Sequence, residues 1–150
     1  MNYELLCRQV RELAQEERWY VPLLSNVSAL IWDALPDLNW AGFYLMRAGQ
    51  LVLGPFQGKV ACIHIAPGRG VCGTAAAQDR TQRVPDVHQF PGHIACDSAS
   101  NSEIVIPLHR DGQVIGVLDI DSPLLNRFTA EDQAGLEALA RALEESLQLD

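Results

Sequence analysis

Residues 103–121, which read EIVIPLHRDGQVIGVLDID, are the stretch that decides the fold. Two apolar runs, Ile104–Leu108 and Val114–Ile120, flank the polar segment Arg110–Gly112. Runs rich in Ile and Val predict strands, and an Asp-Gly pair between two such runs predicts a tight hairpin turn. We therefore expect two neighbouring antiparallel strands here.

This hairpin carries three carboxylic acids. Asp119 and Asp121 alternate along the second strand, so their side chains share one face. A three-residue loop at Arg110–Gly112 would pair Glu103 with Asp119 and unite all three, whereas a two-residue turn would put Glu103 on the other face. Crowded carboxyl groups raise one another's pKa, so one of them can hold a proton near neutral pH. The alternative is a solvated strand end.

Working outward, the periodicity of apolar residues changes along the chain. Helical spacing predicts helices at 3–18, 22–34 and 71–78, and a last helix that begins after the cap Thr129. Strands are predicted at 40–46, 50–54, 60–65 and 81–84, and a long polar loop at 86–101. The sum is an α+β fold: an antiparallel sheet of about six strands with helices at both ends of the chain.

Composition limits the class of protein. The chain has 150 residues, 48% of them hydrophobic, and a formal net charge of −8. This size predicts one domain, residues 1–150. The acidic balance argues against nucleic acid or an anionic membrane as a partner, because both are bound through clustered Lys and Arg. The sequence contains no signal peptide and no apolar run long enough to span a membrane, so we expect a cytoplasmic protein.

The four cysteines lie in different surroundings. Cys96 lies in the polar loop, as His93-Ile94-Ala95-Cys96-Asp97, which is typical of a reactive thiol. Cys62 falls in the predicted strand 60–65, where a small core hydrophobe is an equal possibility. Cys72 opens a helix after a Gly-rich turn, and a helix N-terminus lowers the pKa of a nearby thiol. Cys7, on the first helix, is expected to be inert.

Two sequence patterns give only weak support for a bound cofactor or metal ion. Gly68-Arg69-Gly70-Val71-Cys72-Gly73 fits the dinucleotide pattern GxGxxG, but the parallel strands and the later acidic residue of such a site are missing. His88, His93 and Cys96, with Cys62 or His64, could supply four zinc ligands, yet their spacing matches no standard zinc pattern. We therefore expect no bound cofactor and no metal.

Several motifs together resemble the free methionine-(R)-sulfoxide reductases, a branch of the GAF-domain proteins. The likeness runs from Asn39 to about Leu143. The segments that carry it are Asn39-Trp40-Ala41-Gly42-Phe43-Tyr44, Gly54-Pro55-Phe56-Gln57-Gly58-Lys59, Gly68-Arg69-Gly70-Val71-Cys72-Gly73-Thr74-Ala75, Gly92-His93-Ile94-Ala95-Cys96-Asp97, Ser100-Asn101-Ser102-Glu103-Ile104-Val105 and Gly116-Val117-Leu118-Asp119-Ile120-Asp121-Ser122. The resemblance implies a GAF-like, PAS-related sheet of six antiparallel strands, a homodimer, and free methionine sulfoxide as the substrate.

The implied chemistry assigns the candidate residues. A thiolate attacks the sulfoxide and becomes a sulfenic acid, and a second thiol condenses with it to a disulfide that thioredoxin reduces. Cys96 is the predicted nucleophile and Cys62 the first choice for the resolving thiol. Cys72 is the second choice, with a rival claim to be the nucleophile.

The remaining candidates bind substrate or supply protons. We expect Glu103 and Asp121 to protonate the departing oxygen and, with Asp119, to bind the substrate. Trp40 and Tyr44 alternate on one strand face and are expected to bind the substrate as a wall over its methyl group, although an aromatic stripe is more often part of a core. The competing function is a GAF sensor module that binds a small ligand without turnover.

Overall fold

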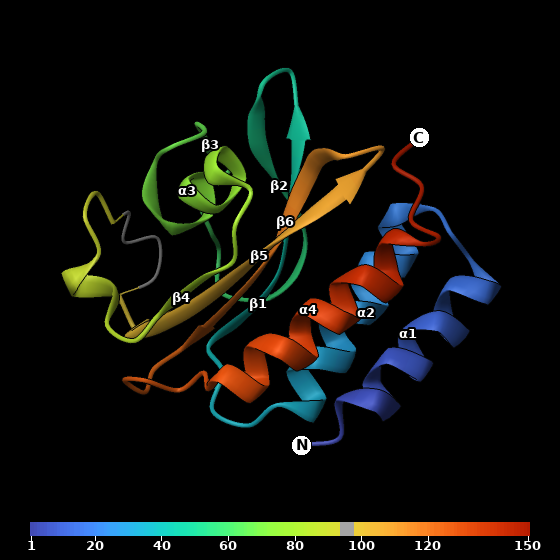
Figure 1. The fold of residues 1–150 in the computed structure, drawn as a ribbon, viewed down its shortest axis with the longest axis horizontal. Coiled ribbons are helices and arrows are strands. Elements are labelled where there is room, and N and C mark those ends of the chain that lie inside the picture. Colours follow the sequence, from blue (N-terminus) through green and yellow to red (C-terminus); the bar gives the residue numbers. More distant parts are fainter. Residues whose placement is uncertain (94–97) are drawn as a thin grey trace.

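The computed structural model describes residues 1–93 and 98–150. Its centre is one sheet with the strand order β3-β2-β1-β6-β5-β4, and every neighbouring pair is antiparallel (Figure 1). The strands are β1 (Trp40–Arg47), β2 (Gln50–Gly58), β3 (His64–Ile65), β4 (Gln82–Val84), β5 (Ser102–Arg110) and β6 (Gln113–Ser122). The helices are α1 (Tyr3–Glu16), α2 (Tyr20–Ala34), α3 (Gly70–Gln78), the 3-10 turn η1 (Val87–Gln89) and α4 (Ala130–Glu144). This confirms the predicted α+β fold.

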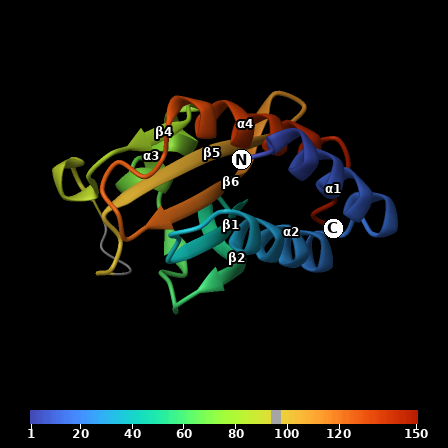
Figure 2. The same cartoon turned by 90° about the horizontal axis from the view of Figure 1, so that it is seen from below.

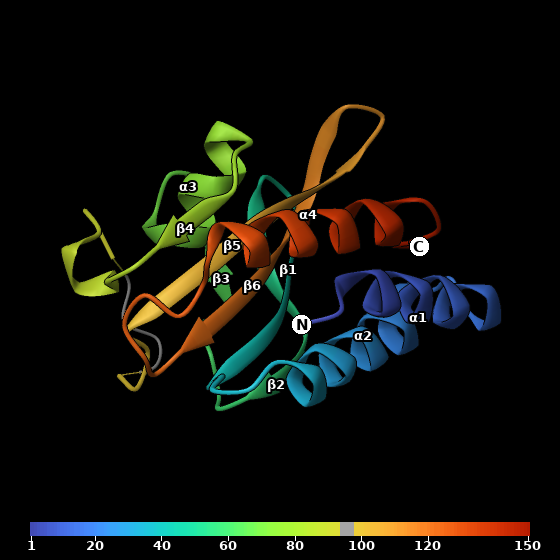
Figure 3. The same ribbon diagram turned by 60° about the horizontal axis from the view of Figure 1, so that its bottom comes forward.

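Three helices cover one face of the sheet. Figures 2 and 3 show α1, α2 and α4 packed side by side on this face, which brings both ends of the chain to it. Thr129 caps α4 as predicted, and its side chain and that of Asp132 form a reciprocal capping box. The apolar stripe of α4 is buried at Leu136, Leu139, Ala140 and Leu143. The larger core lies in this layer.

The opposite face is covered by α3 and by the connections that flank it. A second, separate cluster of buried side chains fills this layer, among them Trp40, Tyr44, Cys72, Val105 and Val117. Strand alternation explains the division, since Ala41 and Phe43 point into the helical core instead. The candidate site lies in this second layer. None of the described helices has the length and apolarity needed to cross a bilayer.

The central hairpin corrects the predicted loop. Arg110 pairs with Gln113, and Asp111 and Gly112 both have positive φ, as a two-residue type I′ turn requires. The expected three-residue loop and the pairing of Glu103 with Asp119 are therefore wrong. A bulge between Leu108 and His109 shifts the register by one residue. The shift places Glu103 opposite Asp121 and restores all three acids to one face.

The predicted strand at 60–65 is also wrong in extent. Strand β2 continues to Gly58, beyond its predicted end, and β3 keeps only His64 and Ile65. Residues 60–63 form a loop: hydrogen bonds from two aromatic side chains hold the backbone at Lys59 and Cys62, and the Leu53 N–H of β2 holds the Ile63 carbonyl. Trp40 Nε1 donates to the Lys59 carbonyl at 3.1 Å, and the Tyr44 hydroxyl donates to the Cys62 carbonyl at 3.0 Å. Cys62 therefore belongs to a loop, not to a strand.

Candidate active site

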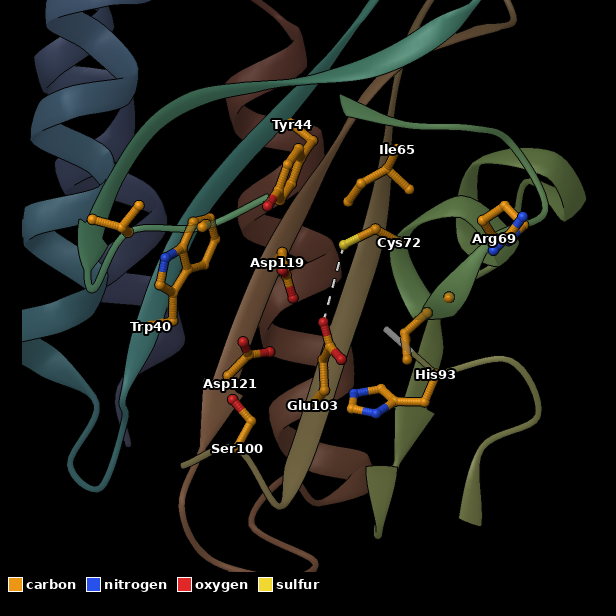
Figure 4. A pocket seen from close by; sticks show the side chains of 14 residues that line it. Trp40, Tyr44, Ile65, Arg69, Cys72, His93, Ser100, Glu103, Asp119 and Asp121 are labelled. Atoms are coloured by element: carbon orange, nitrogen blue, oxygen red, sulfur yellow. Dashed lines mark hydrogen bonds between the residues drawn. The ribbon is translucent and has the colours of Figure 1, made fainter. Parts of the chain in front are cut away.

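A cavity lies between the second face of the sheet, helix α3 and the loop at 60–63 (Figure 4). It holds about 550 Å³ of space between atoms, its open mouth included. The described residues that line it are Trp40, Tyr44, Val60, Ala61, Ile65, Arg69, Gly70, Val71, Cys72, His93, Ser100, Glu103, Asp119 and Asp121. The structure thus brings together six residues that the sequence singled out: both aromatic residues, Cys72 and the three acids.

The three acids form one cluster on two paired strands. Glu103 lies on β5, opposite Asp121 of β6, and Asp119 lies opposite Val105, one alternation further along the same face. Glu103 is 7% exposed and Asp119 is 5% exposed. Because carboxylates are seldom buried without a cationic partner, this cluster is unlike a solvated strand end.

Burial raises the pKa of all three carboxyl groups. The pKa values of Glu103 and Asp121 lie well above the usual range, first because burial penalises the charged form and then because Asp119 is negative beside them. Burial also raises the pKa of Asp119, but hydrogen bonds from Glu103, Cys72 and Asp121 act in the opposite direction. The pKa of Asp119 is therefore raised less than the pKa values of Glu103 and Asp121, so these two neighbours hold their protons more tightly.

Two carboxylate oxygens of the cluster lack a donor. Oδ1 of Asp119 and Oδ1 of Asp121 are buried and accept no hydrogen bond from the described part of the chain. Buried polar atoms are nearly always paired in folded proteins, so unpaired acceptors in a cavity point to a ligand that donates. An ammonium group supplies both the donors and the positive charge that this cluster lacks.

Cys72 borders the same cluster from helix α3. Its Sγ lies 4.0 Å from Oε2 of Glu103, and its side chain is buried. Burial and then the charges of Asp119 and Glu103 raise the pKa of the Cys72 thiol well above its usual value. The expectation that the helix N-terminus lowers this pKa is wrong, because a partial helix charge is outweighed by burial beside carboxylates.

The other cysteines differ in position. Cys62 lies in the loop at the cavity edge, partly buried and disulfide-bonded. Cys7 is a free thiol, like Cys72, and it packs in the helical core away from the cavity. Cys96, the predicted nucleophile, lies outside the described residues, so its place beside the acids stays a prediction.

Stacked aromatic rings form one wall of the site. The ring centroids of Trp40 and Tyr44 are 5.8 Å apart, and those of Trp40 and Phe56 are 5.0 Å apart. Phe56 comes from β2 and supports the ring of Trp40 by stacking on it, without being one of the residues that line the cavity. A signal for it exists at Gly42, where a Cβ atom would come within 2.2 Å of the Phe56 Cβ. Glycine at this position admits the third ring.

Sequence reasoning does not single out Ser100 and offers His93 only as a possible zinc ligand, although both lie in motifs that carry the resemblance. Both line the cavity beside the acids, and Figure 4 shows the His93 ring next to Glu103. Burial lowers the pKa of His93, which favours a neutral imidazole. Ser100 accepts a hydrogen bond from Asn39 Nδ2 at 2.9 Å, which holds its hydroxyl at the base of the site. These residues extend the polar side of the cavity.

The structure also shows how the GxGxxG segment and the possible metal ligands are arranged. Gly68 donates its N–H to the Gly73 carbonyl at 2.7 Å, so the GxGxxG segment is a tight turn, and the antiparallel sheet offers no dinucleotide crevice. Among the described residues, only Cys72, Glu103 and Asp119 bring potential metal-ligand atoms within 4.8 Å of one another. A metal ion there would have to displace protons from groups whose pKa values are raised.

Known proteins similar in sequence belong to the family that the fold and the cavity suggest. The GAF domain family model matches residues 3–147, so the fold and its cavity define a GAF domain protein. A relative from Escherichia coli (strain K12), "Free methionine-R-sulfoxide reductase", is 56% identical over 145 residues, covering 97% of this chain and 88% of the relative. The chain belongs to the free methionine-R-sulfoxide reductase family.

Solved structures agree. The reduced form of fRMsr from Staphylococcus aureus matches with a TM-score of 0.95 and 52% identity, over 99% of this chain and 96% of that one. A free methionine-R-sulfoxide reductase from Neisseria meningitidis, solved in complex with its substrate, matches with a TM-score of 0.92 and 44% identity. That match covers 96% of this chain and 87% of the other.

Proposed function

We propose that this protein reduces the R-sulfoxide of free methionine to methionine, using its own cysteines as reductant. The observation that carries the proposal is the cluster of Glu103, Asp119 and Asp121, buried in one cavity with the Cys72 thiol. Such a cluster offers both an anion for an amine and protonated acids for a leaving oxygen. The names of the close relatives support the same substrate.

Free methionine sulfoxide fits the two sides of the cavity. Its ammonium group can donate to the unpaired oxygens of Asp119 and Asp121, and the ionised Asp119 balances its charge. Its methyl and methylene groups fit against the ring of Trp40. A methionine inside a peptide has no ammonium group, so this arrangement favours the free amino acid.

The chemical step needs a thiolate and a proton. The Cys96 thiolate takes the sulfoxide oxygen, the sulfur–oxygen bond breaks, and a proton from Glu103 or Asp121 completes the sulfenic acid as methionine leaves. The raised pKa values of these two carboxyl groups keep that proton available at neutral pH. The thiolate is oxidised and the sulfoxide sulfur is reduced, so the electrons balance.

Regeneration follows from the second thiol. Cys62 attacks the sulfenic acid, water leaves, and a disulfide forms; Cys72 is the alternative resolving thiol. The raised pKa of Cys72 disfavours its rival role as nucleophile, because a thiol is a poor nucleophile. An external protein dithiol, for which thioredoxin is the candidate, then reduces the disulfide. The protein would work in the cytoplasm, and as a homodimer.

The test is a reaction with purified protein. Dithiothreitol and free methionine-R-sulfoxide should give methionine over many turnovers, while the S-sulfoxide and an R-sulfoxide within a capped peptide should give little. Methionine is measured by chromatography. Binding of the sulfoxide without release of methionine would overturn the proposal and favour a ligand-binding sensor.

A further inference from the structure

We propose that the loop of residues 59–63 is the docking surface for the protein dithiol that reduces the enzyme, and that this dithiol attacks Cys62. The inference rests on the proposed function, because it concerns the reductive half of that reaction. It adds a surface, a partner of stated charge and a point of attack.

The loop displays apolar side chains around Cys62. Val60 is 89% exposed and Ile63 is 60% exposed, whereas the backbone between them is anchored inward by the hydrogen bond from Tyr44 to the Cys62 carbonyl. The Leu53 N–H donates to the Ile63 carbonyl at 2.9 Å and fixes the other end of the loop. The two apolar side chains are therefore held facing solvent on both sides of a disulfide-bonded cysteine.

Exposed apolar side chains beside Cys62 can serve as a contact surface for a protein that reduces its disulfide. An attacking thiolate must reach one sulfur of a disulfide directly, and a protein brings its cysteine there only by contact with the residues around it. Protein interfaces of this transient kind use a small apolar centre with a charged rim. Val60 and Ile63 supply the centre, and the partly exposed Cys62 lies between them in the sequence.

Charge indicates the kind of partner. The chain carries 19 acidic residues and a net charge of −8, yet residues 38–78 contain no Asp or Glu and three cations, Arg47, Lys59 and Arg69. Lys59 and Arg69 are exposed close to the loop and the cavity. The segment that carries Cys62 is thus locally basic in an acidic protein. This complements an acidic protein dithiol and steers its approach.

The exchange balances in two steps. A thiolate of the partner attacks Sγ of Cys62, the enzyme disulfide breaks, and the sulfur that was bonded to Cys62 leaves as a thiolate. The second thiolate of the partner then attacks the mixed disulfide and releases Cys62. The enzyme is reduced by two electrons and the partner becomes a disulfide.

The experiment compares two reductants on matched variants. Ile63→Asp is the test, and Leu125→Asp is the control, because Leu125 is 61% exposed but lies in another loop. With thioredoxin as reductant, Ile63→Asp should lower kcat/KM for thioredoxin about tenfold, the value of roughly one apolar contact. Leu125→Asp should not. With dithiothreitol, both variants should turn over within about twofold of the wild-type rate.

A kcat/KM for thioredoxin that is unchanged in Ile63→Asp, or equally reduced in Leu125→Asp, would overturn the docking surface. If Ile63→Asp also loses turnover with dithiothreitol, Lys59→Glu decides, because Lys59 is exposed and accepts the hydrogen bond from Trp40 through its backbone carbonyl, which the substitution keeps. Lys59→Glu should lower kcat/KM for thioredoxin several-fold at low salt and make this kcat/KM less dependent on salt concentration. An unchanged kcat/KM would reject the proposal.

A trapping arm separates this inference from the proposed function. Thioredoxin with its second cysteine replaced by serine should form a mixed disulfide with the oxidised enzyme, and peptide mass mapping should find it at Cys62. Mapping to another cysteine contradicts the proposed point of attack. Failure to release methionine with dithiothreitol would contradict the proposed function alone, because the trap reads the disulfide without turnover.

Discussion

Glu103 lies directly opposite Asp121 across the β5–β6 ladder, although a regular two-residue hairpin would place it opposite Ile120. The bulge at Leu108 and His109 causes this shift in pairing, although it lies about 5 residues from Glu103 in a strand of 9 residues. One extra residue in β6 exchanges the faces of every side chain beyond it. The acid cluster therefore depends on an irregularity at the other end of the hairpin.

Removing one acidic proton should slow the reaction. We expect Glu103→Gln and Asp121→Asn each to lower kcat by roughly 100-fold or more, the usual scale for general acid catalysis. The measurement is methionine release with dithiothreitol in excess. A loss of less than fivefold in both variants would remove general acid catalysis from the account.

The raised carboxyl pKa values predict the direction of the pH dependence. The active form of Glu103 and Asp121 is the protonated one, so kcat should fall as pH rises through their raised pKa values. This basic limb should be lost or moved in Glu103→Gln. A kcat profile that rises steadily with pH and does not differ between wild type and Glu103→Gln would contradict this assignment.

Glu103 should also make stability depend on pH. Its folded pKa is raised, so the folded state holds the proton more tightly, and the stability this gives is present below the unfolded pKa and lost as pH rises through the folded pKa. We expect Glu103→Gln to raise Tm at pH 8 by about 2–4 °C, with a smaller difference at pH 4. Glu12→Gln, at an exposed helix position, is the matched control and should change Tm little.

Trp40 is the aromatic residue expected to contact the substrate. Trp40→Ala should raise KM for free methionine sulfoxide roughly tenfold, the cost of about 1.4 kcal/mol of lost contact. Trp40 is 3% exposed, so Trp40→Phe, which keeps a stacked ring, tests whether the effect is one of packing. Trp32→Ala, at a half-exposed position on α2, should leave KM unchanged. An unchanged KM in Trp40→Ala would return Trp40 to a purely structural role.

Local patterns predict much of this fold. Periodicity locates the helices, and strand alternation correctly unites Asp119 with Asp121 and Trp40 with Tyr44. The bulge is not predictable, because Ile115, the extra residue of β6 between the partners of Leu108 and His109, fits a regular strand as well as a bulged one. The loop at 60–63 resembles a strand in sequence for a similar reason: Val60 and Ile63 are apolar, and the hydrogen bonds from the Trp40 and Tyr44 side chains that hold this segment are tertiary contacts.

The pKa of Cys72 and the position of Phe56 could not be predicted from local sequence. A helix N-terminus suggests an acidic thiol at Cys72, and the sequence cannot show that two strands from elsewhere bring carboxyl groups against it. Phe56 stacks on Trp40 through the same kind of long-range contact, with Gly42 as its sequence signal. The missed features all depend on side chains that meet across separate elements.

The most direct test of the account is a single turnover with pre-reduced enzyme and no external reductant. Wild type should release about one equivalent of methionine per chain from free methionine-R-sulfoxide. Cys96→Ser should release none. Cys62→Ser and Cys72→Ser should each still release about one equivalent, because methionine leaves when the sulfenic acid forms, before a resolving thiol attacks it. A full equivalent from Cys96→Ser with none from Cys72→Ser would contradict the assignment and make Cys72 the nucleophile.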